Sequence, residues 1–183
     1  MYQNGMMPGG AGNISIRDRD GIYITPSGVS KGFLNEEDIV VVDSHGKCLF
    51  GDNPTSELPM HLAIYQKRDD IDAIIHCHAA NTVALSVHGR NFISDLLPEI
   101  KIKYGSIPVL DYAEPSTQQS ADVLIPHLDS GICGAILPFH GIVTMADTLE
   151  NACLIAESIE YAAQVQVLAQ TMGNIRKYTE ARN

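Results

Sequence analysis

The sequence predicts one α/β domain over residues 1–183, built on a sheet that is not purely parallel. Short runs with strand-like alternation are interleaved with segments whose apolar residues recur at helical spacing. The earliest pairs of such runs are joined by short turn sequences, which is typical of antiparallel hairpins. A chain of 183 residues with 45% apolar and 19% charged side chains is also long and apolar enough to bury a core.

Hairpin signals dominate the first fifty residues. Residues 1–12 are glycine-rich and have no periodic apolar face, so we expect an irregular lead-in rather than a packed element. The first hairpin turns at the Asp-Gly pair of residues 20–21, and the second turns at residues 44–46. The strands predicted here are residues 13–17, 22–25, 38–43 and 48–50.

The rest of the chain alternates helices with short apolar strands. Two of the predicted helices start with a capping box, formed by Ser116 with Gln119 and by Asp147 with Glu150. The predicted helices are one that begins near residues 54–56 and others over 79–87, 116–128 and 147–173. The predicted strands are residues 72–78, 107–110, 135–137 and 142–145.

The charge balance limits the partners of the protein. Its 12 basic and 22 acidic side chains give a net charge of −10, whereas nucleic acid and anionic membranes require a basic face. No stretch approaches the ~18 consecutive apolar residues of a membrane span, and the first residues lack a basic-then-apolar signal pattern. We therefore expect a cytoplasmic protein that binds neither nucleic acid nor membrane.

The four cysteines do not predict a cross-linked or zinc-knuckle fold. Cys48, Cys77, Cys133 and Cys153 are too few and too scattered for a disulfide framework, and none forms a Cys-x-x-Cys pair. We expect them to be reduced and mostly buried thiols.

Three histidines form a candidate metal site. His76 and His78 lie two apart in a predicted strand, so their imidazoles share one face while Cys77 points to the other. His140 follows another short strand at a tight turn, which places a third imidazole at a strand end. Three neutral imidazoles can hold zinc, or another divalent transition metal, and leave a position open for substrate. The alternative is a group of surface histidines with no ligand role.

Glu57 and His61 lie one helical turn apart near the start of the helix that follows residues 54–56. Glu57 is either a general base that also contacts the metal, or an acid that stabilises the helix dipole by under about 1 kcal/mol. His61 shares its face by the i, i+4 rule. His61 therefore either hydrogen-bonds to a metal ligand or competes as one, and we favour the first role.

A candidate anion site precedes the same helix. Two hydroxyl residues come directly before Glu57, where the free backbone N–H groups of a helix N-terminus bind anions. Two turn pairs beside the first two strands could add amide donors, although each pair alone is ordinary turn chemistry. The candidate residues are Gly12, Asn13, Ser27, Gly28, Thr55 and Ser56. The net charge does not oppose an anion here, because surface charges beyond roughly 8 Å are screened.

Five short motifs occur in a fixed order along the chain. They are Gly-Asn-Ile-Ser-Ile-Arg at 12–17, Ile-Thr-Pro-Ser-Gly at 24–28, Pro-Thr-Ser-Glu at 54–57, His-Cys-His-Ala at 76–79 and His-Gly at 140–141. Each motif alone is modest evidence, but five in register are specific. Over residues from about 9 to 173 the sequence resembles the class II aldolase/adducin family.

This resemblance implies a fold and a site. The fold is a three-layer α/β/α sandwich around a mixed, mainly antiparallel sheet. The site has zinc held by His76, His78 and His140, and Glu57 is the catalytic acid/base that also approaches the metal. The six candidate anion residues correspond to the phosphate cradle of the family. The resemblance further implies a C4 homotetramer with the active site at a subunit interface.

The resemblance also implies a reaction. A fuculose-1-phosphate-like ketose would be cleaved to dihydroxyacetone phosphate and an aldehyde through a metal-stabilised enediolate, with Glu57 returning the proton. Other chemistries of the family remain open, namely pentulose-5-phosphate 4-epimerisation, methylthioribulose-1-phosphate dehydration and decarboxylation. A non-catalytic interaction domain like the adducin head is a further alternative, although we would expect it to have lost its metal ligands.

The aldehyde half of the substrate is the part that the motifs do not cover. Family aldolases place one tyrosine downstream of the His-x-His strand and another in a C-terminal tail. The first of these positions aligns near Leu97 in this sequence. Tyr104, Tyr112 and Tyr178 are the candidates to replace the missing tyrosines.

Overall fold

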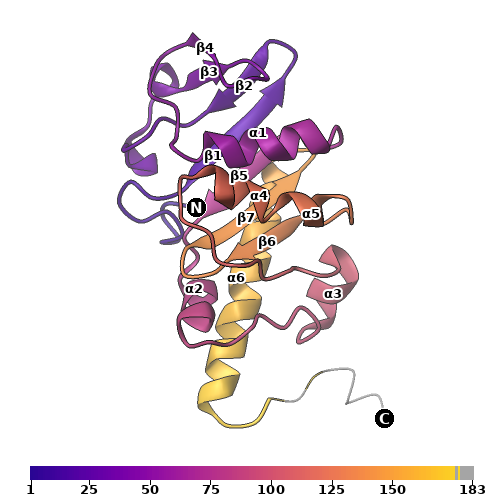
Figure 1. Cartoon of the computed structure of the whole chain (residues 1–183). Helices are drawn as coiled ribbons and strands as arrows, with labels where there is room; N and C mark the ends of the chain where they lie inside the picture. The colour runs from indigo at the N-terminus through magenta and orange to yellow at the C-terminus, as the bar shows by residue number, and fades with distance from the viewer. Residues whose placement is uncertain (176, 178–183) are drawn as a thin grey trace.

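The computed structural model describes residues 1–175 and residue 177, which form a seven-stranded sheet covered by helices (Figure 1). The strand order is β4-β3-β2-β1-β5-β7-β6, and every neighbouring pair is antiparallel. The N-terminal hairpin therefore pairs with the middle of the chain, and Asn13 lies opposite His76. The strands are β1 (Asn13–Asp18), β2 (Gly21–Ile24), β3 (Val40–Val42), β4 (Cys48–Phe50), β5 (Ala73–Cys77), β6 (Gly134–Leu137) and β7 (Gly141–Ala146).

Helices lie on both faces of this sheet, which confirms the predicted three-layer sandwich. One layer consists of α1 with α4 and α5, and the other consists of α6 with α2 and α3 (Figure 1). Within the described residues, the parallel contact is an isolated bridge between Val109 and Ile136. The helices are α1 (Leu58–Lys67), α2 (Ala80–Val87), α3 (Pro98–Tyr104), α4 (Gln118–Asp122), α5 (Ile125–Leu128) and α6 (Leu149–Thr171), with 3-10 turns η1 (Lys31–Phe33) and η2 (Glu36–Asp38).

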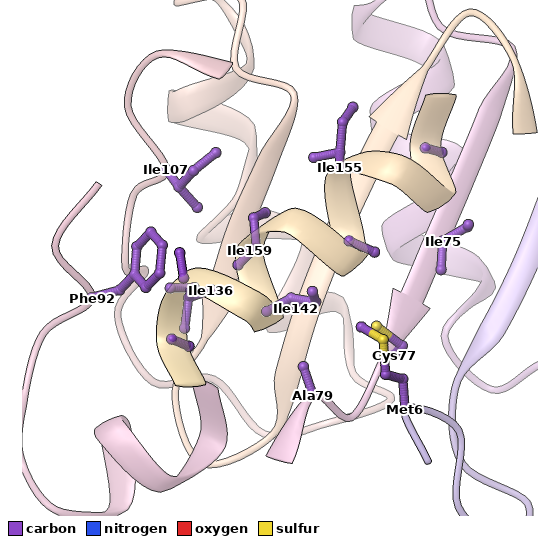
Figure 2. Packing of buried hydrophobic residues seen from close by; sticks show 14 of the residues in the cluster. Met6, Ile75, Cys77, Ala79, Phe92, Ile107, Ile136, Ile142, Ile155 and Ile159 are labelled. Carbon is purple, nitrogen blue, oxygen red and sulfur yellow. The ribbon is translucent and has the colours of Figure 1, made fainter. Parts of the chain in front are cut away.

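Alternation along β5 divides the core into two halves. Ile75 and Cys77 point into the cluster under α6, which also contains Ile159 (Figure 2). Ile74 belongs to the opposite cluster, under α1. Burying side chains of this size stabilises the fold by roughly 1.5–3 kcal/mol each. Because the strand period is two, the same alternation turns His76 towards the α1 face.

The N-terminal segment is packed, so the prediction of an unpacked lead-in is wrong. Residues 1–12 contain no helix or strand, as expected. Met6 and Met7 are nevertheless buried, and Met6 packs beside Cys77 (Figure 2). The backbone N–H of His78 also donates to the Met6 carbonyl at 2.8 Å. Glycines interrupt this segment, so no apolar periodicity signalled its burial.

The helix predicted over 116–128 is two short helices, α4 and α5. Pro126 lies in the first turn of α5, where its missing N–H prevents a continuous hydrogen-bond ladder. Ser116 does not cap α4, because it lies one residue before the N-cap position with a left-handed φ of 61°. The capping box predicted for α6 is also wrong, since the Thr148 hydroxyl accepts from the Asn151 N–H instead.

Three further segments differ from the prediction. Residues 107–110 form no strand, and the Pro108 carbonyl and Leu110 N–H make two bonds to Ile136. Pro108 has no N–H with which to extend that pairing. Helix α3 was not predicted, because its seven residues are too few to show a helical period. The helix expected near residues 54–56 begins at Leu58, which leaves Glu57 at its N-cap position.

All four cysteines are free. Cys77 is buried, but Cys48 is exposed and the other two are partly exposed, so the expectation of mostly buried thiols is wrong. Among the described residues, no helix has both the length and the apolar character needed to cross a bilayer.

Candidate metal centre and substrate pocket

The three predicted histidines meet at one end of the sheet. His76 lies in β5, His78 follows its last residue, and His140 lies in the turn between β6 and β7. Because β5 pairs with β7, these segments end side by side. The ring centroid of His76 is 5.1 Å from that of His78 and 4.5 Å from that of His140. One ring nitrogen from each histidine lies within 4.8 Å of the others.

Gly141 allows this close approach. A Cβ atom on Gly141 would overlap the carbonyl group of Cys77 on the neighbouring strand. Without a side chain, β7 can begin directly against the end of β5. The preceding residue, His140, is thereby held against the His76 ring.

The protonation pattern of His76 leaves a lone pair facing the centre. His76 Nδ1 lies 2.9 Å from the Ile142 carbonyl oxygen, which can only accept, so Nδ1 carries the hydrogen. In a ring with one hydrogen, His76 Nε2 is then an acceptor, and this atom is buried without a hydrogen-bond partner. Glu57 Oε2 lies 3.0 Å from that nitrogen. Two acceptors so close in a buried site indicate a position for a cation.

Glu57 lies between two of the imidazoles. Its side chain is buried, and Oε1 lies 3.6 Å from His140 Nε2 without a hydrogen-bond partner. Its other oxygen, Oε2, accepts from Asn13 Nδ2 at 2.9 Å. The carboxylate therefore has one oxygen held by an amide and one oxygen free.

The pKa shifts of His78, His140 and Glu57 favour the protonation states that a metal requires. Burial, assisted by the neighbouring imidazoles, lowers the pKa of His78 to about 4, and burial also lowers the pKa of His140. Burial opposes the charged form of Glu57, but the pKa of Glu57 is held below its usual value, to which the hydrogen bond from the Asn13 amide contributes. Neutral imidazoles and a carboxylate are the forms that bind metal ions.

His61 is a hydrogen-bonding residue rather than a rival ligand in this geometry. It is fully buried in α1, and its Nε2 lies 2.6 Å from Asn13 Oδ1. Its Nδ1 lies 2.7 Å from Ser15 Oγ. Both ring nitrogens are therefore occupied by protein groups, and His61 reaches Glu57 through the Asn13 amide.

A polar cavity of about 180 Å³ opens beside the histidines. Its walls include His78, His140 and Glu57 together with the N-terminus of the ten-residue helix α1. All six residues predicted for anion binding line it, namely Gly12, Asn13, Ser27, Gly28, Thr55 and Ser56. The structure thus brings the candidate metal ligands and the candidate anion residues together.

Two further residues of this cavity were missed from the sequence. Lys31 lines it and donates from Nζ to the Gly10 and Val29 carbonyls, at 2.8 and 3.0 Å. Ser116, which we interpreted as a helix cap, lines it too and shares a 2.7 Å hydrogen bond with Ser56 Oγ. Neither residue belongs to one of the short sequence motifs, so no local signal pointed to either of them.

The candidate tyrosines lie in different places. Tyr104 shares a hydrogen bond with Ser158 on α6 and does not line the cavity. Tyr112 is exposed, and its ring contacts Phe139, the residue before His140, with centroids 6.1 Å apart. Tyr178 lies outside the described residues.

The fold and the histidine cluster together place the chain among three-layer α/β/α proteins with histidines gathered at the strand ends. Residues 1–167 match the family model described as the Class II Aldolase and Adducin N-terminal domain, and the chain belongs to the class II aldolase/adducin family.

Named relatives differ in their reactions. The chain is 37% identical over 172 residues to L-fuculose phosphate aldolase of Methanococcus maripaludis (strain C7), covering 94% of this chain and 93% of that protein. It is 33% identical over 169 residues to 3-oxo-tetronate 4-phosphate decarboxylase of Haemophilus influenzae, covering 90% and 80%. A solved structure of L-fuculose 1-phosphate aldolase aligns with a TM-score of 0.87 at 34% identity, covering 96% of this chain and 84% of that one.

Proposed function

We propose that the protein is a metal-dependent aldolase that cleaves a phosphorylated ketose into dihydroxyacetone phosphate and an aldehyde. The observation that carries the proposal is the buried acceptor pair of His76 Nε2 and Glu57 Oε2, 3.0 Å apart at the edge of the polar cavity. Similarity to proteins named as fuculose phosphate aldolases supports this reaction class.

The residues present fit a divalent metal, and we propose zinc held by His76, His78 and His140, with Glu57 close to it before substrate binds. Imidazole nitrogens suit zinc and similar transition metals, whereas magnesium and calcium prefer oxygen ligands. When bound, the metal would supply Lewis-acid stabilisation of the negative charge that develops on substrate oxygens as the carbon–carbon bond breaks.

The polar cavity would bind the phosphate group of the substrate. The N-terminus of α1 lies at this cavity with the positive end of its helix dipole, and the hydroxyls of Thr55 and Ser56 supply donors beside it. Lys31 contributes a positive charge to the same cavity, and an ammonium is a common phosphate partner. These groups would orient the ketose so that its carbonyl end reaches the histidines.

Glu57 would move the proton. Because Asn13 holds Oε2, the unpartnered Oε1 is the oxygen that can accept a hydrogen. In the direction of condensation it would take a proton from the carbon of dihydroxyacetone phosphate, and in the direction of cleavage it would return that proton.

A second candidate function is decarboxylation, which the Haemophilus relative favours. Epimerisation of a pentulose 5-phosphate and dehydration of methylthioribulose 1-phosphate are the other family reactions to compare. A purely structural domain is disfavoured, since such a domain has no use for three clustered imidazoles beside a buried carboxylate.

The test is to incubate the zinc-loaded protein with a panel of ketose 1-phosphates that includes fuculose 1-phosphate. Dihydroxyacetone phosphate is measured by its reduction with glycerol-3-phosphate dehydrogenase. Glu57→Gln should keep its zinc and lose activity by about 10² to 10⁴-fold. Formation of an isomer, a dehydrated product or carbon dioxide, with no dihydroxyacetone phosphate from any ketose, would refute the aldolase proposal.

We also propose a cytoplasmic homotetramer with the active site at a subunit interface. The exposed pair of Tyr112 and Phe139 beside His140 supports an interface at this position, because exposed aromatic residues are enriched at protein contacts. Four free cysteines are in keeping with a reducing compartment.

A further inference from the structure

A chain of buried hydrogen bonds leads from the protein interior to Glu57. It begins at the Tyr65 hydroxyl, which lies 2.8 Å from Ser15 Oγ. Ser15 Oγ lies 2.7 Å from His61 Nδ1, and His61 Nε2 lies 2.6 Å from Asn13 Oδ1. The Asn13 amide then donates to Glu57 at 2.9 Å. All five residues are buried, with at most 5% of each residue exposed.

The hydrogens of this chain can be assigned from Glu57 backwards. A carboxylate only accepts, so Asn13 must present its NH₂ group to Glu57 and its carbonyl oxygen to His61. That oxygen also only accepts, so His61 carries its hydrogen on Nε2. A neutral imidazole then has an acceptor at Nδ1, to which Ser15 donates.

The last step of the assignment concerns the tyrosine. Because the single Ser15 hydrogen is used on His61, Tyr65 donates to Ser15 at 2.8 Å rather than to the more distant Asp72 carbonyl at 3.5 Å. Every donor in the chain therefore points in the same direction, from Tyr65 towards Glu57. Such chains strengthen their members cooperatively, and they resist reversal because every member would have to turn at once.

We propose that His61, fixed as its Nε2–H tautomer by Ser15 and Tyr65, is a positioning residue that holds the Asn13 amide with its NH₂ group towards Glu57. If the amide turned over, its carbonyl oxygen would face the carboxylate and its NH₂ group would face a donor. Both contacts would then be repulsive in a buried site. Glu57 would lose the donor that holds Oε2 and leaves Oε1 as the free oxygen.

The catalytic role of this hydrogen-bond chain rests on the proposed function, but the tautomer of His61 does not. The tautomer of His61 exists whether or not the protein cleaves a ketose phosphate. It can be measured in protein labelled with ¹⁵N-histidine, since a protonated and an unprotonated ring nitrogen have very different nitrogen shifts. The His61 signals are assigned by their loss in His61→Gln.

We expect one protonated nitrogen, Nε2, and one unprotonated nitrogen, Nδ1, in the metal-free and the zinc-loaded protein. Ser15→Ala should remove the donor to Nδ1 and change the Nδ1 nitrogen shift, while Nε2 keeps the hydrogen that Asn13 Oδ1 accepts. Detection of the Nδ1–H tautomer in the unmodified protein would overturn the assignment, even if the aldolase activity were confirmed.

A matched pair of variants tests the positioning role. His61→Gln keeps an N–H donor towards Asn13, whereas His61→Leu has a similar volume and no donor. We expect His61→Leu to lower kcat by roughly 10- to 100-fold with little change in KM or zinc content, as is usual for residues that support ligands. His61→Gln should recover most of that loss.

Thermal stability separates this role from packing alone. If kcat falls equally in His61→Gln and His61→Leu, or falls only in proportion to the loss of folded protein, then His61 is structural and the proposal is wrong. Should the protein prove inactive on every ketose phosphate, the aldolase proposal fails while the measured tautomer still decides the inference.

Discussion

Glu57 Oε2 and His76 Nε2 lie 3.0 Å apart where solvent barely reaches. The Nδ1 hydrogen of His76 is used on the Ile142 carbonyl, so a ring with one hydrogen has none at Nε2 to donate to Glu57. Two buried lone pairs at this distance repel each other unless a cation or an added proton lies between them. A metal relieves this repulsion without charging the ring, which is why the residues fit a metal centre.

Removing a ligand should therefore remove the metal. His76→Ala and His140→Ala are each expected to lose stoichiometric zinc after dialysis, measured by elemental analysis of the purified protein. His88, exposed at the end of α2, provides the matched control, and His88→Ala should keep its zinc. Unchanged zinc in both ligand variants would show that the metal is bound elsewhere.

His61 should make folding stability depend on pH. Burial lowers the pKa of His61 to about 3 from its ordinary 6.5. As the pH falls below 6.5, the unfolded chain gains a proton that the folded protein excludes, so the free energy of unfolding decreases towards pH 3. This contribution is fully present above the ordinary pKa of the ring.

The measurement is a denaturant titration of the metal-free protein at about pH 7.5 and about pH 5. The unmodified protein should lose more stability between these conditions than His61→Gln, which has no titrating ring at this position. Equal losses in the two proteins would mean that His61 is not held neutral by burial.

At the scale of single residues, the sequence indicated the candidate metal ligands better than the residues that hydrogen-bond to them or line the cavity. His76 and His78 could be predicted because strand alternation places their side chains on one face. His140 could be predicted because it follows a strand at a turn. The sequence could not predict the roles of Lys31, Ser116 and the Asn13 side-chain amide, because these roles arise from contacts between distant segments. No local period reports such contacts.

At the scale of elements, the strands and the long helix α6 were predictable, whereas the short helices α3, α4 and α5 were not. Helix α6 has a helical period of apolar residues and strands β5 and β7 are short buried runs, and all three were predicted within a few residues. Helix α3 is too short to show a period, and the segment 116–128 is broken by a proline whose effect depends on the packing around it. Ser116, which lines the cavity, belongs to this less predictable segment.

The start of β7 is the element boundary on which the site depends most. Gly141→Ala would place a Cβ atom into the Cys77 carbonyl, so the two strands must separate and carry His140 away from His76. We expect a loss of about 1–3 kcal/mol in the free energy of unfolding, typical of overpacking, together with weaker zinc binding.

Gly10→Ala is the stability control for this variant, since the nearest atom to an added Cβ there is at an ordinary 3.5 Å. Denaturant titration and zinc competition measure the two effects. If Gly141→Ala matched the unmodified protein in both, the close approach of β7 to β5 would not be what positions His140.

At the scale of the whole molecule, the α/β/α architecture was predictable because five motifs in register fix the family, and the hairpin signals agree with an antiparallel sheet. Subunit contacts are different, since they depend on surfaces that a single chain does not complete. Here one chain supplies all three histidines, Glu57 and the anion cavity. The aromatic pair beside His140 remains exposed in that single chain.

If the metal site lies within one chain and the aldehyde site is completed by a neighbouring subunit, zinc binding and activity should respond differently when the tetramer dissociates. The protein should sediment at about 80 kDa, four times its 19.9 kDa chain mass. Dilution below the dissociation constant of the tetramer should leave zinc bound, because all its proposed ligands lie on one chain. Specific activity should nevertheless fall in parallel with the tetramer, because the aldehyde half would lose the neighbouring subunit that completes its site.

A chain that sediments near 19.9 kDa at every concentration would refute the tetramer. If the tetramer forms but the dissociated subunits keep full specific activity, the active site does not lie at a subunit interface. The tetramer itself would then still stand. If zinc is lost together with the tetramer, the metal needs a ligand from the neighbouring subunit, and the three-histidine centre of one chain is incomplete. The dilution series thus distinguishes how much of the active site belongs to one chain and how much to the assembly.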